Sequence, residues 1–194
     1  TCAPALPALT IQPIITYKGV NTAGVLDSLG VRVKVAGTVY GVNQYSSSST
    51  PIGVQFVMID GTGGIMFRKA GTNFGLTNLA EGDSVIATGI LEQFNGLTQI
   101  NLDTLERVAT GRTLRQPTVV TNVSEATENE FIRINNLSIT GGTWPTSGSA
   151  NITVSNGTNT FTMRVIAQTN IPGTPAPTGP FDAIGLGGQF DSSN

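Results

Sequence analysis

Apolar and polar residues alternate along several short segments of the chain, and this pattern predicts β-strands. The clearest case is residues 31–39, VRVKVAGTV, in which valines alternate with basic or small residues. A period of two places the apolar side chains on one face of a half-buried strand. Apolar segments at 56–59 and 65–68 flank an Asp-Gly pair at 60–61. Because Asp-Gly favours tight turns, these two segments are predicted to form a hairpin.

The same order of segments occurs a second time, which predicts two copies of one domain. Residues 132–139 repeat the long strand, and Asn156-Gly157 repeats the hairpin turn. A third match relates Gly89–Phe94 to Gly185–Phe190. This match and the turn at Asp60 both lie 96 residues apart (185 − 89 and 156 − 60). Internal repetition at a fixed spacing indicates duplicated units.

Each copy is predicted to be a small five-stranded Greek-key barrel of the OB type, with a β-sandwich as the main alternative. Both copies are predicted to begin with a strand at a Gln-Pro pair, at residues 12–13 and 116–117, and Arg133 is predicted to take the place of Arg32. The predicted organisation is an N-terminal arm (1–9), a first domain (10–108), a linker (109–115) and a second domain (116–194).

The two copies differ at their ends. The first continues past Phe94 into a closing strand at 97–105, whereas the second stops at Asn194. The second barrel is therefore predicted to lack the strand that closes it. One explanation is that the chain is truncated at Asn194. The other is strand addition by the N-terminal arm of a neighbouring copy, in which the assembly residues are Leu6, Leu9 and Ile11.

Charge and composition narrow the range of functions. Charged residues make up 11% of the chain, the net charge is −2, and the ten basic residues are scattered. Nucleic-acid binders usually carry a basic face, so a nucleic-acid partner is not expected. There is no histidine, and the single cysteine excludes an intrachain disulfide. No apolar run approaches the roughly 18 residues that span a bilayer, so no membrane partner is expected.

The carboxylates give no clear site. Glu125, Glu128 and Glu130 cluster before a predicted strand, but they lack the spacing of an EF-hand loop. They are predicted to form a solvated loop, with a calcium site as the weaker alternative. Asp60 is explained by its turn. Because no nucleophile lies beside a base, we expect no enzyme, no catalytic residue, no metal and no cofactor.

Aromatic residues are the feature that favours a binding groove. OB domains stack nucleic-acid bases on exposed aromatic side chains within a basic groove. Aromatic residues inside short strands usually lie in the core, and few cations lie near those of the second copy, so these residues are predicted to lie mainly in the core. The candidates are Tyr40, Tyr45, Phe56 and Phe67 in the first copy and Trp144 and Phe161 in the second.

These strands and turns resemble the OB-fold-like domains of secreted Bacteroidetes proteins, which are often joined to secreted nucleases or to cell-surface proteins with a C-terminal sorting domain. The matching stretches are residues 29–41, 53–61, 81–85, 89–101 and 117–191. The resemblance implies an OB-like fold and a location outside the cell or on its surface. The matching motifs are strands and turns, and they contain no catalytic residue.

Glycans are expected as covalent partners. In the family resembled here, an Asp-Ser/Thr-apolar pattern implies O-glycosylation, which places it at Ser28, Ser84 and Thr104. Four Asn-x-Ser/Thr sequons are candidates for N-glycosylation, at Asn122, Asn136, Asn151 and Asn156.

Two functions of different classes remain. The first is a non-catalytic extracellular structural protein that assembles with copies of itself, head-to-tail, into a filament or surface layer by strand complementation. The alternative is a binding module, for single-stranded nucleic acid or glycan, of a larger secreted enzyme.

Overall fold

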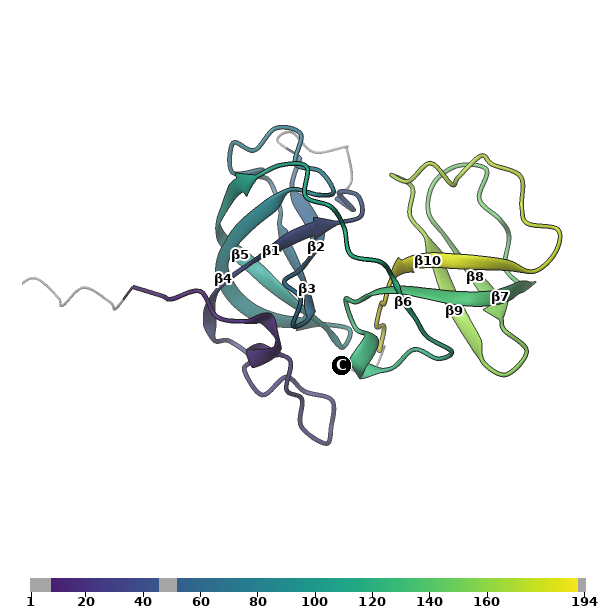
Figure 1. Ribbon diagram of the computed structural model, residues 1–194, viewed down its shortest axis with the longest axis horizontal. Helices are drawn as coiled ribbons and strands as arrows, with labels where there is room; N and C mark the ends of the chain where they lie inside the picture. The colour runs from purple at the N-terminus through teal and green to yellow at the C-terminus, as the bar shows by residue number, and fades with distance from the viewer. Residues whose placement is uncertain (1–7, 46–51, 192–194) are drawn as a thin grey trace, which may run out of the picture.

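The computed structural model describes residues 8–45 and 52–191. The regular secondary structure of these residues consists of β-strands and short 3₁₀ helices (Figure 1). Of the predicted assembly residues, Leu6 lies outside the described residues. The first repeat contains β1 (Arg32–Tyr40), β2 (Val54–Ile59), β3 (Gly64–Lys69), β4 (Ser84–Phe94) and β5 (Leu97–Ala109). The second repeat contains β6 (Thr118–Val119), β7 (Phe131–Gly141), β8 (Ala150–Ser155), β9 (Thr160–Val165) and β10 (Phe181–Leu186).

The strands of the first repeat are hydrogen-bonded in a closed ring, in the order β1-β2-β3-β5-β4. β1 is long enough to pair with β4 along most of its length and with β2 near its end. β5 lies between β3 and β4, parallel to the first and antiparallel to the second. The interior of the ring is apolar, and β5 contributes Ile100 and Leu102, whose side chains are fully buried.

The second repeat forms an open sheet of five strands. β7 pairs with β6, β8 and β10, and β9 pairs with β8 at the far end. No described segment lies between β9 and β10, where the first repeat has β5. The predicted fold class is confirmed for the described residues: they are all-β, the first five-stranded sheet is closed and the second is open.

The spacing of 96 residues relates the strand pairing of the two repeats. Ile59 pairs with Gly64 in the first hairpin, and Ser155 pairs with Thr160 in the second. The hairpin turns also share their chemistry, because Asp60 and Asn156 each accept backbone N–H groups two and three residues ahead. Side-chain oxygens at this position stabilise such turns in place of a backbone group.

The long strands β1 and β7 follow a different spacing. Lys34 pairs with Thr88, whereas Arg133 pairs with Ile184, which lies 96 residues after Thr88. Arg133 therefore takes the place of Lys34, and the prediction that it matches Arg32 is wrong. A sequence comparison with one fixed offset gives the wrong alignment because β7 shifts its register twice. One shift lies between Ile134 and Leu137, where Asn136 has a φ of +57°, and the other lies between Ile139 and Gly141.

The first predicted Gln-Pro strand is a short 3₁₀ helix, η1 (Ile14–Tyr17), and the prediction of a strand there is wrong. The Asp60 carboxylate accepts the Ile14 N–H at 2.8 Å, and the Thr62 hydroxyl accepts the Ile15 N–H at 3.2 Å. These bonds satisfy the free N–H groups at the start of the helix. At the second Gln-Pro pair, the predicted strand is present but short, as β6.

No helix among the described residues is long and apolar enough to cross a membrane.

Candidate functional site

The gap between β9 and β10 is the main candidate site, because it leaves two strand edges unpaired within the described sheet. Unpaired strand edges expose N–H and C=O groups that can bind another strand. We refer to this gap as the strand slot. Its walls are β9 on one side and β10 on the other.

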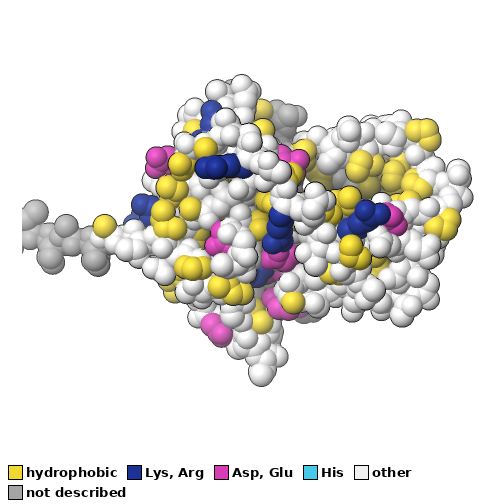
Figure 2. Space-filling view, in the orientation of Figure 1, with side chains coloured by type: hydrophobic (Ala, Val, Ile, Leu, Met, Phe, Trp, Pro, Cys, Tyr) yellow, Lys and Arg dark blue, Asp and Glu magenta, His cyan; other side chains and the backbone are white. Residues whose placement is uncertain are grey.

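The strand slot exposes apolar side chains that are buried in the first repeat. Met163, Phe181 and Ala183 point toward the core of the second sheet but are only half-buried. The residues 96 positions earlier are Phe67, Val85 and Ala87, and each of these is fully buried. The difference follows from β5, which covers the first set and has no described counterpart over the second. Figure 2 shows hydrophobic side chains gathered in a hollow of the second repeat.

A second feature is the junction between the two repeats, where three residues of the second enter the open end of the first. The Glu128 carboxylate accepts the Thr98 N–H at 2.5 Å, and the Asn129 amide donates to the Thr98 carbonyl at 3.2 Å. Glu130 accepts the Gly64 N–H at 2.8 Å. We call Glu128, Asn129 and Glu130 the clasp. It bridges the ends of β3 and β5 through side chains of the second repeat.

Charged groups inside the clasp are paired. The Lys18 ammonium lies 3.4 Å from Glu128 Oε2 and donates to the backbone carbonyl oxygens of Glu128 and Gly64. Arg115 of the linker pairs with Glu130. Glu128 is 2% exposed, and its Oε2 accepts no hydrogen bond from the described residues. Burial raises the pKa of the Glu128 carboxyl, against the opposing effects of the Thr98 N–H and the Lys18 charge.

The clasp corrects one prediction. A solvated loop was expected for the three glutamates, but only Glu125 is fully exposed. Glu128 and Glu130 lie in the junction, where N–H groups and cations interact with their carboxylates. A buried carboxylate requires such partners. The described residues contain no group of three or more His, Cys, Asp or Glu residues placed to hold a metal ion.

Apolar packing completes the junction. Tyr40, Val57, Ile59 and Met66 lie on the outer face of the first ring, and each is almost fully buried. Phe131 and Leu186 of the second repeat pack against them, with linker residue Leu114 and with Leu97 of β5. The second repeat therefore packs on the outer face of β2 and β3. In OB domains, the type predicted for each repeat, the face of strands 2 and 3 binds ligands.

The aromatic candidates for base stacking are mostly occupied elsewhere. Phe56 and Phe67 stack on each other inside the ring, with centroids 6.0 Å apart. Tyr40 lies in the junction against Phe131 at 5.2 Å. Phe161 belongs to the second core, and Trp144 donates to the Thr174 carbonyl. Phe56, Phe67 and Phe161 lie in the two cores and Tyr40 lies in the junction. These four rings therefore form no exposed row on which bases could stack.

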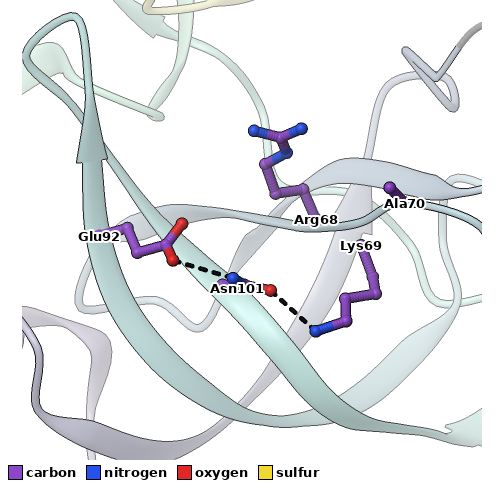
Figure 3. A pocket seen from close by; sticks show the side chains of 5 residues that line it. All are labelled: Arg68, Lys69, Ala70, Glu92 and Asn101. Carbon is purple, nitrogen blue, oxygen red and sulfur yellow. Dashed lines mark hydrogen bonds between the residues drawn. The ribbon is translucent and has the colours of Figure 1, made fainter.

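A polar hollow lies on the first repeat, over β3, β4 and β5 (Figure 3). Lys69 donates to Asn101, and Asn101 donates to Glu92. The Arg68 side chain points away from this chain of hydrogen bonds in Figure 3, and it has no partner among the described residues. The hollow is open and mostly polar, and no aromatic side chain lines it.

The predicted glycosylation residues differ in their surroundings. Ser28 donates to the Tyr17 carbonyl in a turn, and Ser84 is half-buried at the start of β4. The Asn156 amide nitrogen donates to the Thr121 carbonyl, so a glycan there competes with this bond. The fully exposed candidates are Thr104, Asn122, Asn136 and Asn151.

The described N-terminal segment, from residue 8 on, begins on the side of the first repeat opposite the second (Figure 1). Leu9 is half-buried and Ile11 is 48% exposed. Just after the arm, the Gln12 N–H donates to the Lys34 carbonyl of the first sheet at 3.0 Å. The described residues 8–12 thus do not reach the strand slot of their own chain.

The sequence contains a signal for the junction in the hairpin strands of the two repeats. Residues 56–59, FVMI, are continuously apolar, whereas 152–155, ITVS, alternate. A continuously apolar strand is typical of a sheet that is covered on both faces, and an alternating one of a sheet with one solvated face. The contrast between these segments indicates that only the first repeat has a covered outer face.

No family model and no curated protein sequence matches the chain.

Proposed function

We propose that this chain is a non-catalytic extracellular structural subunit, which joins to further copies of itself head-to-tail by strand complementation. The carrying observation is the strand slot: two unpaired strand edges beside half-buried Met163, Phe181 and Ala183. Such an edge binds a strand or is covered, because exposed edges otherwise cause aggregation. The secreted location is supported by the low charge and by the resemblance to secreted OB-like domains.

The proposed occupant is the N-terminal arm of a neighbouring copy. Leu9 and Ile11 occupy alternate positions, so both fall on one face when the arm is extended. Burial of a leucine or isoleucine side chain stabilises a contact by about 1.5–3 kcal/mol. The described start of the chain, from residue 8, lies on the side of the first repeat opposite the second repeat (Figure 1), so the proposed donor of the arm is another copy.

A contact between the arm of one copy and the slot of the next is heterologous. Such contacts build an open filament unless the rotation between copies closes a ring. The clasp and the apolar junction join the two repeats, and these contacts restrict how one repeat can turn relative to the other. This supports an ordered assembly rather than a flexible string of domains.

A binding module for a glycan or single-stranded nucleic acid is the second candidate. The polar hollow favours it, since Arg68 is free to meet an anionic or hydroxyl-bearing ligand. Against it, the outer face of β2 and β3 is covered by the second repeat, and the net charge is −2. We therefore rank it below the structural function.

Electron microscopy and analytical ultracentrifugation of three proteins test the proposal. Wild type is expected to form filaments or closed rings. The double variant Leu9→Asp, Ile11→Asp is expected to remain monomeric, because its arm places two charges against an apolar slot. Thr10→Asp is the matched control, as residue 10 points to the other side of an extended arm, and it should assemble like wild type. Assembly by the double variant, or monomers in all three proteins, contradicts the proposal.

A further inference from the structure

We infer that the strand slot binds an extended segment in one polarity and register, parallel to β9 and antiparallel to β10. This inference rests on the proposed function and makes it more specific. It follows from the position of β5 in the first repeat, carried over to the second by the spacing of 96 residues.

The register on β10 comes from the pairing of β4 with β5. Ala87 pairs with Leu105, and Gly89 pairs with Leu102. The corresponding residues of β10 are Ala183 and Gly185 (87 + 96 and 89 + 96), and both lie in the β10–β7 ladder at the expected places. An incoming strand therefore places an apolar side chain beside Ala183 and another beside Gly185, where the slot has room for it.

The register on β9 comes from the parallel pairing of β3 with β5. Phe67 pairs with Ile100, and the residue 96 positions after Phe67 is Met163. An incoming strand thus places a third apolar side chain beside Met163, which is half-buried. The required pattern is that of Ile100, Leu102 and Leu105. The second apolar residue lies two positions after the first, and the third lies three positions after the second.

The occupant is the arm of a second copy, and the pattern shows how much of the slot it fills. Leu9 and Ile11 have the spacing of Ile100 and Leu102. The residue three positions further is Ile14, which is fully buried in its own ring and not available. The arm thus covers Met163 and the place beside Gly185, and it leaves the position beside Ala183 open.

Peptides test this polarity and register on the full chain. The probe is a synthetic peptide of residues 97–109, which supplies all three apolar positions; a peptide of residues 1–12 supplies two. Both are expected to bind, the first more tightly. A peptide of residues 97–109 carrying Leu102→Asp and Leu105→Asp should bind at least tenfold more weakly. In the protein, Ala183→Asp should weaken binding of the 97–109 peptide at least tenfold, whereas Ile184→Asp, on the exposed side of β10, should not.

Nitroxide labels on the peptide report the polarity. A label at the N-terminus of the 97–109 peptide should broaden the amide signal of Leu186, and a label at its C-terminus should broaden that of Phe181. The opposite result, or no binding of this peptide to the wild-type chain, overturns the inference. If the 97–109 peptide binds in the stated polarity but the 1–12 peptide does not, the slot and its register stand, the arm is not the occupant, and the proposed assembly fails.

Discussion

The two repeats share an interior and differ on the outside. At the inward positions of the hairpin, Phe56 and Met58 correspond to Ile152 and Val154, all of which are buried. At the outward positions, Val57, Ile59 and Met66 correspond to Thr153, Ser155 and Thr162. One fold therefore carries two surfaces: the first repeat has an apolar outer face that receives the second, and the second has a polar face in the same place.

The difference extends to the clasp. A Cβ at Gly64 would collide with the backbone carbonyl of Asn129, so this position accepts the clasp only as glycine. The corresponding residue of the second repeat is Thr160, which carries a side chain. The second repeat is thus unable to receive another repeat in the way that the first receives it. The proposed self-assembly therefore needs a surface other than this junction, for which the strand slot is the candidate.

A charge introduced on the outer face is expected to lower the free energy of unfolding far more in the first repeat than in the second. This is the largest expected difference between the repeats. Met66→Asp places a carboxylate in the apolar junction, where it has no cation, and is expected to lower the free energy of unfolding by about 3 kcal/mol or more. Thr162→Asp changes the corresponding exposed residue and should alter it by less than about 0.5 kcal/mol. Urea unfolding of both variants measures the difference. Equal losses at the two positions mean that the outer faces are not distinct.

The buried Glu128 gives a smaller effect, which depends on pH. Its folded pKa is raised above the ordinary value of 4.5 by burial. The group therefore contributes stability fully below the unfolded pKa, and this contribution is lost as the pH rises through the folded pKa. Relative to wild type, Glu128→Gln should become progressively more stable as the pH rises through that interval and level off above it.

Urea unfolding at a series of pH values measures this difference, with Glu106→Gln on the exposed side of β5 as the control. The control should track wild type at every pH. If the stability difference between Glu128→Gln and wild type does not change with pH, or falls as the pH rises, the account of the clasp is wrong.

The fold could be read from the sequence because alternation and turn chemistry are local signals. The hairpin turns at Asp60 and Asn156 and the alternation in β1 each depend on a few neighbouring residues. The repeated spacing of 96 residues then carried this information from one repeat to the other and revealed the missing strand. The two register shifts in β7, one at Asn136 and one between Ile139 and Gly141, moved it against β1, which local comparison did not detect.

The junction was not predicted because its contacts join residues far apart in the sequence. Lys18 and Glu128 are separated by 110 residues, and neither lies in a motif. Asn129 occupies the backbone position in the second repeat that Gly30 occupies in the first. Both residues have a positive φ, and their N–H groups donate to equivalent carbonyls, those of Gly187 and Leu91. A sequence comparison finds this equivalence only when the register of β10 is known. The glutamates on either side of Asn129 looked like solvated residues because their partners lie in the other repeat.

The most direct test of the strand slot is hydrogen exchange at the backbone amides of β9 and β10, measured in assembled wild-type protein and in the monomeric double variant Leu9→Asp, Ile11→Asp. Exchange slows when an amide is hydrogen-bonded in a stable sheet. We predict slower exchange in β9 and β10 of the assembled protein, with no change in β2–β5 of the first repeat, whose edges are already paired. Equal exchange of β9 and β10 in the two samples would contradict the account.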